Sequence, residues 1–209
     1  MMKLLVPLSL LTLAADCSAI DAVLKADIST STTSPARKLI PDAPRLRIGK
    51  GHITSLKFDA HAVVPAGITA DEIAKAVLKI WVNKTRDFSP GGIEVYGAER
   101  LWEEREVSRY GIPTFTRNQN RIAFATVRSS DSYVVFDVTS AVKGWFAGQP
   151  NNGFVLTSFS PLSRAGYIRI YPDDPYYEEW SIETYLNAWL DSKESKGNEP
   201  TLQLVLKPK

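Results

Sequence analysis

Cysteine and histidine are nearly absent from this chain of 209 residues. Cys17 is the only cysteine, so a framework of internal disulfides is excluded and the fold must depend on its core. His52 and His61 are the only histidines, and their spacing matches no metal-ligand pattern. We interpret both as ordinary polar residues, with metal binding or lyase chemistry as the alternative.

Excess charge of one sign is also missing. Lysine and arginine number 25 against 23 acidic residues, which gives a net charge of +2. Such a balance does not favour nucleic acid as a partner, but it is compatible with an acidic polysaccharide. The chain also lacks a Gly-x-Ser-x-Gly nucleophile motif and a phosphate-binding glycine-rich loop, because the segment Gly49-Lys50-Gly51 is too short to form one.

No apolar run is long enough to span a bilayer. The longest, residues 4–15, follows a short positive start and precedes small residues, which is typical of a secretory signal peptide. We predict a signal peptide over residues 1–19 and one domain over 20–209. The protein is then secreted, extracellular or periplasmic, with no transmembrane segment once the signal is removed. A lipoprotein anchored through Cys17 is the alternative, although Asp16 fits that motif poorly.

Short alternating segments separated by turn residues predict an all-β fold. The clearest strands are residues 53–59, 76–83, 93–98, 121–127, 133–138, 154–159, 167–171 and 201–207. A further strand is expected at 22–28 and a loop at 29–36, while 176–198 is compatible with either helix or strand. Some eight to nine antiparallel strands indicate a jelly-roll-like β-sandwich.

One short helix is expected near residues 139–147. Asp137 and Thr139 stand where a helix would begin, and their oxygens can accept bonds from its unpaired N–H groups. Val142 and Trp145 follow at helical spacing on one face. The helix is therefore predicted to cap an open end of the sandwich with these two side chains.

An ordered set of short segments resembles the DNRLRE-domain family, near the disaggregatase-related domains and carbohydrate-binding module family 96. The segments are LRIG at 46–49, SLKFD at 55–59, AVLKIW at 76–81, GIEVY at 92–96, WEE at 102–104, FDVT at 136–139 with Val142 and Trp145, NG at 152–153, SKES at 192–195 and PTL at 200–202. The resemblance implies a secreted jelly-roll module that in some members binds acidic polysaccharides, with Trp102 and Trp145 as structural anchors.

Strand alternation points to one candidate ligand site. In residues 167–171 the two isoleucines are expected to face the core, so Tyr167, Arg169 and Tyr171 share the outer face. Aromatic rings beside a guanidinium suit the C–H faces and carboxylates of sugars. Trp81, on the polar side of its strand, and Trp180 are expected to extend this platform. The alternative, that these aromatics pack under a long loop, stays open.

Carboxylates offer two further hypotheses. Asp173, Asp174, Glu178 and Glu179 lie near the aromatic cluster, and an acid–base pair among them would make a polysaccharide hydrolase or lyase. No cofactor is expected to be required, but loop oxygens could hold a structural Ca²⁺. Its candidate ligands are Asp27 and Asp59, with Asp137 and Glu194 as further contributors.

The sequence therefore leaves three functions open. The first is a secreted, non-catalytic module that binds a polysaccharide or cell-envelope glycan, with an acidic polymer as one form of it. The second is a structural or adhesive extracellular module with no sugar site. The third is a polysaccharide hydrolase or lyase. The oligomeric state is not predicted.

Overall fold

The longest strand, β5, organises one of two antiparallel sheets. The computed structural model describes residues 21–33, 43–49, 52–86, 91–103, 115–116, 120–159 and 186–208. The first sheet contains β1 (Asp21–Lys25), β3 (Arg45–Ile48), β5 (Ile73–Arg86), β8 (Ser132–Asp137), β10 (Asn187–Asp191) and β11 (Thr201–Leu206). On one edge of β5, β11 pairs with the first half and β10 with the second, while β8 pairs along the opposite edge. β1 then lies beyond β11, and β3 beyond β10.

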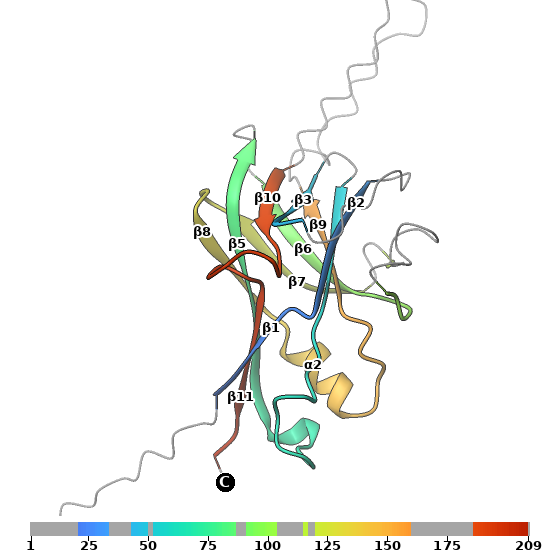
Figure 1. Cartoon of the computed structure of the whole chain (residues 1–209). Helices are drawn as coiled ribbons and strands as arrows, with labels where there is room; N and C mark the ends of the chain where they lie inside the picture. The colour runs from blue at the N-terminus through green and yellow to red at the C-terminus, as the bar shows by residue number, and fades with distance from the viewer. Residues whose placement is uncertain are drawn as a thin grey trace, which may run out of the picture.

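The second sheet has five strands in the order β2-β4-β9-β6-β7. These are β2 (Ile28–Thr33), β4 (His52–Lys57), β9 (Phe154–Phe159), β6 (Gly91–Gly97) and β7 (Arg121–Val127). Figure 1 shows the two sheets facing each other, with the helix α2 (Thr139–Phe146) at the lower end of the molecule in that view. The predicted all-β sandwich with one short helix is thus confirmed.

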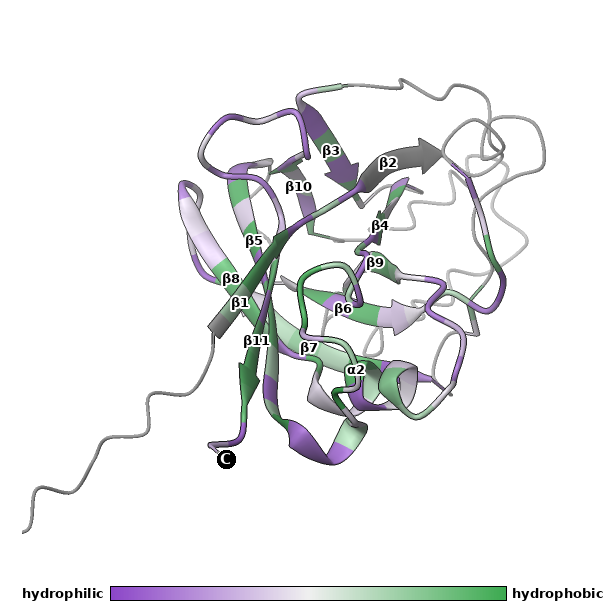
Figure 2. Cartoon of the chain, turned by 60° about the horizontal axis from the view of Figure 1, so that its bottom comes forward, coloured by the Kyte–Doolittle hydropathy of each residue, from purple (hydrophilic) through white to green (hydrophobic). Residues whose placement is uncertain are grey.

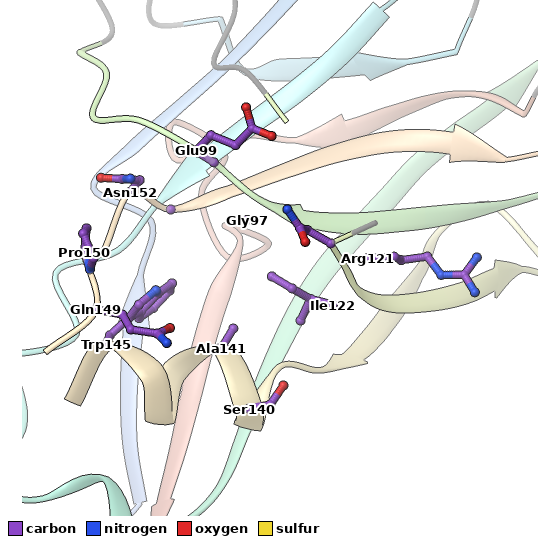
Figure 3. A pocket seen from close by; sticks show the side chains of 13 residues that line it. Gly97, Glu99, Arg121, Ile122, Ser140, Ala141, Trp145, Gln149, Pro150 and Asn152 are labelled. Carbon is purple, nitrogen blue, oxygen red and sulfur yellow. The ribbon is translucent and has the colours of Figure 1, made fainter. Parts of the chain in front are cut away.

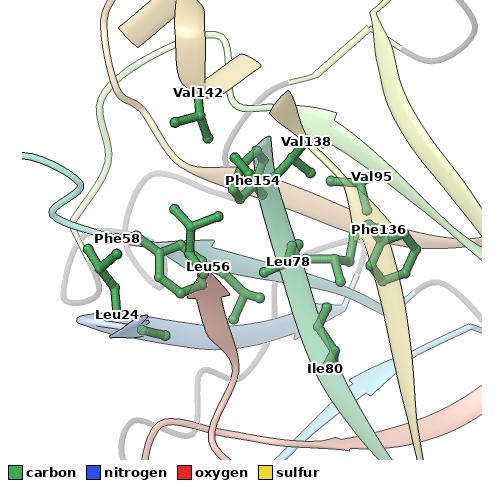
Figure 4. Close-up of a cluster of buried hydrophobic side chains, with 14 of the residues drawn as sticks. Leu24, Leu56, Phe58, Leu78, Ile80, Val95, Phe136, Val138, Val142 and Phe154 are labelled. Atoms are coloured by element: carbon green, nitrogen blue, oxygen red, sulfur yellow. The ribbon is translucent and has the colours of Figure 1, made fainter. Parts of the chain in front are cut away.

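The core lies between the sheets because side chains of each strand alternate between its two faces. Bands of hydrophobic and hydrophilic residues alternate along β5 (Figure 2). Four alternate residues of β5 are fully buried: Ala76, Leu78, Ile80 and Val82. They belong to one cluster with residues of the second sheet and α2, and Figure 4 shows Leu78, Phe154 and Val142 among its side chains.

The start of α2 is fixed by side chains at the end of β8. Asp137 Oδ1 accepts hydrogen bonds from the Thr139 N–H, at 3.0 Å, and from its hydroxyl, at 2.6 Å. These bonds hold the pKa of the Asp137 carboxyl below its ordinary value, because they favour the charged form. The Thr139 hydroxyl oxygen in turn accepts a bond from the Ala76 N–H at 2.9 Å, which ties α2 to β5.

The inner face of α2 contributes Val142, which is fully buried, and Trp145, which is 8% exposed. The Trp145 ring lies 5.0 Å from the Phe154 ring, measured between centroids. The helix ends at Phe146, and Gly148 follows in the turn with a φ of +93°, a conformation that glycine adopts without strain. The side chains of Val142 and Trp145 therefore close the core at this end of the sandwich.

The sequence predictions fail at two places near the N-terminus. Residues 29–36 were expected to be a loop, but residues 28–33 form β2, which pairs with all of β4. Threonine is β-branched, which favours a strand where a partner strand is present. The strand expected over 22–28 is also divided, because the chain passes from the first sheet to the second at Ala26 and Asp27.

Two short elements lie next to the strands of the first sheet or complete it, β10 and a 3₁₀ turn before β5. Asn187–Asp191, in the segment that was compatible with helix or strand, forms β10. Ahead of β5 the chain also forms the 3₁₀ turn η1 (Ala70–Glu72), where the Thr69 N–H donates to Glu72 Oε2 at 2.8 Å. The strand expected at 167–171 lies outside the described residues. Within the described ranges, no helix combines the length and the apolar character that crossing a membrane would require.

Asp191 gives the fold a testable pH dependence. Burial raises the pKa of its carboxyl, against hydrogen bonds to Asn198 and Asn83 that lower it. The folded state therefore keeps the proton to higher pH than the unfolded chain, and stability falls as pH rises through the raised pKa. In the Asp191→Asn variant the side chain stays neutral, so this part of the decrease in stability between about pH 3 and pH 8 is expected to be absent. Melting temperatures across that range test it; parallel curves for the two proteins would contradict it.

Candidate functional site

The first sheet presents a continuous surface on the side away from the core, here called the outer face. It is formed by Val23 and Lys25 of β1, Lys75, Val77, Lys79 and Trp81 of β5, Tyr133, Val135 and Asp137 of β8, and Thr201 and Gln203 of β11. The register sets these side chains next to one another, since Trp81 pairs with Tyr133 and Lys79 pairs with both Val135 and Thr201. The face therefore crosses four neighbouring strands.

An aromatic pair and a cation lie at one end of the outer face. The Trp81 and Tyr133 rings are 4.8 Å apart between centroids and meet edge to face at 75°. The ammonium of Lys79 lies 4.7 Å from the centroid of the Tyr133 ring, a cation–π distance. Tyr133 is 41% exposed, and its hydroxyl donates to Asn198 Oδ1 at 3.3 Å, which restrains the ring. Exposed aromatic carbon thus lies beside a positive charge.

The lysines of the outer face differ in how their charge is balanced. Lys25 forms an ion pair with Glu199 at 2.9 Å. Lys79, by contrast, forms no ion pair with any residue in the part of the chain that the structure describes. Its charge is therefore available to an anionic ligand that lies along the sheet.

The outer face contains only part of the predicted platform. Tyr167, Arg169, Tyr171 and Trp180 lie outside the described residues. The structure joins Trp81 to Tyr133 and Lys79, which the sequence analysis did not select. Alternation placed Lys79 beside Trp81 on one strand, but the partner strand that brings Tyr133 requires the register of β5 with β8.

Trp102 lies on the other side of the molecule. It is 5% exposed and belongs to a small cluster outside the second sheet, with Ile53, Tyr96, Ala98 and Val155. Its indole N–H donates to the Asn152 carbonyl oxygen at 2.8 Å. That bond holds the segment between α2 and β9 against the end of β6.

The structure brings Asp27 and Asp59, the two main candidate ligands for Ca²⁺, next to each other. The Asp59 N–H donates to a carboxylate oxygen of Asp27. However, the described residues contain no group of three or more His, Cys, Asp or Glu side chains that could hold a metal. A Ca²⁺ site commonly uses six to eight oxygens, so backbone carbonyls or water would have to complete this one. Calcium binding stays a prediction, which a thermal melt with and without a chelator tests.

The histidines occupy unrelated places. Burial, aided by the charge of Arg47, lowers the pKa of His52, so its neutral form is favoured. The His61 ring lies 4.4 Å from the Phe146 ring of α2, between centroids. The two side chains thus have different surroundings and form no common site.

A buried carboxylate that the sequence analysis missed lies on the second sheet. Glu94 of β6 is 3% exposed, and its two oxygens accept bonds from the Tyr96 hydroxyl, at 3.0 Å, and from Arg121 Nη1, at 2.9 Å. One oxygen is thus engaged from within β6 and the other from the neighbouring strand β7. The carboxylates proposed for acid–base chemistry, Asp173, Asp174, Glu178 and Glu179, lie outside the described residues.

Comparison with known families gives one result. Residues 48–169, more than half of the chain, match the model of carbohydrate-binding module family 96. The matched range runs from the end of β3 past β9 and contains Trp81, Tyr133 and Lys79. A search of curated proteins gives no match.

Proposed function

Since the chain belongs to carbohydrate-binding module family 96, we propose that it is a secreted, non-catalytic module that holds an acidic polysaccharide on the outer face of its first sheet. A cell-envelope glycan with carboxylate groups is such a polymer. The observation that carries the proposal is the half-buried Trp81 packed on the exposed Tyr133, with Lys79, which pairs with no described acidic residue, beside them.

The chemistry of these groups fits a sugar chain. The C–H face of a pyranose packs on aromatic carbon, and the carboxylate of a uronate forms a charge-assisted bond with an ammonium. The amide and hydroxyl of Gln203 and Thr201, half-buried on the same face, can hydrogen-bond to sugar hydroxyls. An open strand surface leaves both ends of an extended polymer free, so binding within a chain is favoured over binding at its end.

A glycan array of neutral and carboxylated polysaccharides tests the proposal. We expect retention of carboxylated polymers, with alginate and pectin as probes, and weaker retention as salt rises, because exposed charges are screened over about 8–10 Å at moderate ionic strength. Methyl-esterified pectin, which lacks most of the charge, is the matched control and is expected to bind less.

The same experiment separates the two other functions. Binding to no glycan on the array would contradict the proposal and favour a structural or adhesive module. Release of reducing ends, or absorbance from unsaturated uronates in the incubated samples, would contradict the non-catalytic assignment and favour a hydrolase or lyase.

A further inference from the structure

A pocket of about 420 Å³ lies beside α2, apart from the outer face. It is an open pocket lined by α2, the end of β6, the start of β7 and the segment that leads into β9 (Figure 3). Its volume falls in the range of roughly 300–1,000 Å³ that ligand pockets show. None of the residues that line it belongs to the outer face.

The apolar part of the pocket is formed by Trp145, Ile122 and Ala141. Gly97, the last residue of β6, lines the pocket beside them. A Cβ atom added at Gly97 would meet only Ile122 Cδ1, at 3.7 Å, which is an ordinary contact. Among the described residues, none other than Ile122 fills the space beside Gly97, and an indole ring and two aliphatic side chains border the pocket.

The polar part depends on a glycine inside α2. Glycine in a helix interior costs about 1 kcal/mol relative to alanine. At Gly144, an added Cβ would overlap Gln149 Oε1 and lie 3.0 Å from Gln149 Cδ. The missing side chain thus leaves room for the side-chain amide of Gln149 next to the helix. The backbone N–H of Gln149 donates to the Gly144 carbonyl oxygen at 2.9 Å, which holds the Gln149 backbone against the helix end. The glycine costs helix stability, and the side-chain amide of Gln149 occupies the space beside it at the pocket.

Further hydrogen-bonding groups surround this amide. The side chains of Gln149 and Ser140 are exposed and form no hydrogen bond with other described residues. One oxygen of the Glu99 carboxylate accepts a bond from the Thr116 hydroxyl. An amide offers donors and an acceptor, and a carboxylate accepts strong bonds from hydroxyl groups, so the set suits a ligand rich in hydroxyls.

The charge of the pocket distinguishes it from the outer face. Arg121 lines the rim, but its guanidinium is held by the Glu94 carboxylate at 2.9 Å, and Figure 3 shows its side chain directed away from the cavity. Glu99 then leaves the pocket with a negative charge, which repels an anionic ligand. The outer face has the opposite preference, because its Lys79 pairs with no acidic side chain in the described part of the chain.

We propose that the pocket beside α2 is a second sugar site, which takes a neutral pyranose such as the end of a glycan chain. The apolar wall packs against the C–H face of the ring, and Gln149, Ser140 and Glu99 bond its hydroxyls. The protein then holds two kinds of sugar at separate places, an acidic chain on the outer face and a neutral residue in the pocket. The second site does not depend on the first.

The test uses the full chain and the indole N–H resonance of Trp145 in ¹H–¹⁵N NMR spectra, assigned with Trp145→Phe. The probes are the methyl glycosides of glucose, galactose and mannose, with methyl galacturonoside as the charged control. At least one neutral glycoside is expected to shift the Trp145 resonance, and the uronoside is not. A shift with none of the neutral probes, or an equal shift with the uronoside, would overturn the proposal.

Gly144→Ala separates binding from stability. The new methyl group is expected to keep or raise the melting temperature, since alanine favours the helix, yet to displace the Gln149 amide. The affinity for the neutral glycoside should fall about five- to tenfold, the effect of one lost hydrogen bond. Lys143→Ala, on the same helix but outside the pocket, is the control. An unchanged affinity in Gly144→Ala would show that the Gln149 amide does not bond the glycoside.

Filling the cavity gives an independent check. Gly97→Leu is expected to abolish the Trp145 shift, because its side chain occupies the free space beside Ile122. Retention on carboxylated polymers is expected to remain, and this retention shows that the variant is folded. A Trp145 shift that persists in this variant would contradict the pocket. If the wild type is not retained on carboxylated polymers, only the proposed glycan site on the outer face is contradicted. The proposal for the pocket is judged by the Trp145 shift, so the two proposals can fail separately.

Discussion

Replacing Trp145 with alanine is expected to lower the free energy of unfolding by about 3–5 kcal/mol. Its indole is 8% exposed, and it packs on Phe154, which is fully buried. The variant would leave a cavity at the end of the core that α2 closes, next to Val142. Since domains of this kind are stable by about 5–15 kcal/mol in total, the loss is a large fraction of the whole.

Urea unfolding followed by far-UV circular dichroism measures this loss. Ser140→Ala is the matched control, because Ser140 is exposed on the same helix and its replacement is expected to change the free energy by less than about 0.5 kcal/mol. A Trp145→Ala midpoint close to that of the control would show that α2 is not needed to close the core.

Replacing Trp81 with alanine is expected to weaken binding to carboxylated polysaccharide about 30-fold. Buried aromatic anchors of binding sites commonly contribute 2 kcal/mol or more, and 1.4 kcal/mol corresponds to a factor of ten. The substitution also removes the ring against which Tyr133 packs at 4.8 Å. Stability should fall only slightly, because Trp81 lies outside the core cluster.

Phe124→Ala is the matched control for this experiment. Phe124 is 42% exposed, and its ring meets that of Phe159 edge to face at 5.4 Å, but it lies on the second sheet. Affinity gel electrophoresis with alginate measures both variants. Equal retardation of Trp81→Ala and the wild type, or equal losses in the two variants, would place the glycan elsewhere.

Much of the fold could be predicted from the sequence, because strand alternation is a local signal. The pattern from Ala76 to Val82 gave the buried and outer sides of β5 correctly, and Leu202, Leu204 and Leu206 of β11 are all buried. The family resemblance was also visible in short segments, and its carbohydrate-binding part is confirmed by the match over residues 48–169.

The rest depends on contacts between distant residues, which local patterns do not contain. β2 is rich in serine and threonine, and it becomes a strand because β4 offers it a partner. The pairing of Trp81 with Tyr133 joins residues 52 positions apart, as the register of β5 with β8 sets it. The relation of Gly144 to Gln149 required the geometry of the helix end, since glycine at position 144 alone predicts only a weaker helix.

The most direct test of the central claim uses the five tryptophans as separate reporters. An acidic oligosaccharide, prepared from alginate, is titrated into the ¹⁵N-labelled protein while the five indole N–H resonances are followed, with the Trp81 signal assigned by Trp81→Phe. We predict that the Trp81 resonance shifts in a saturable manner, while those of the buried Trp102 and Trp145 keep their positions. A saturable shift of Trp102 or Trp145 with Trp81 unmoved would contradict binding on the outer face.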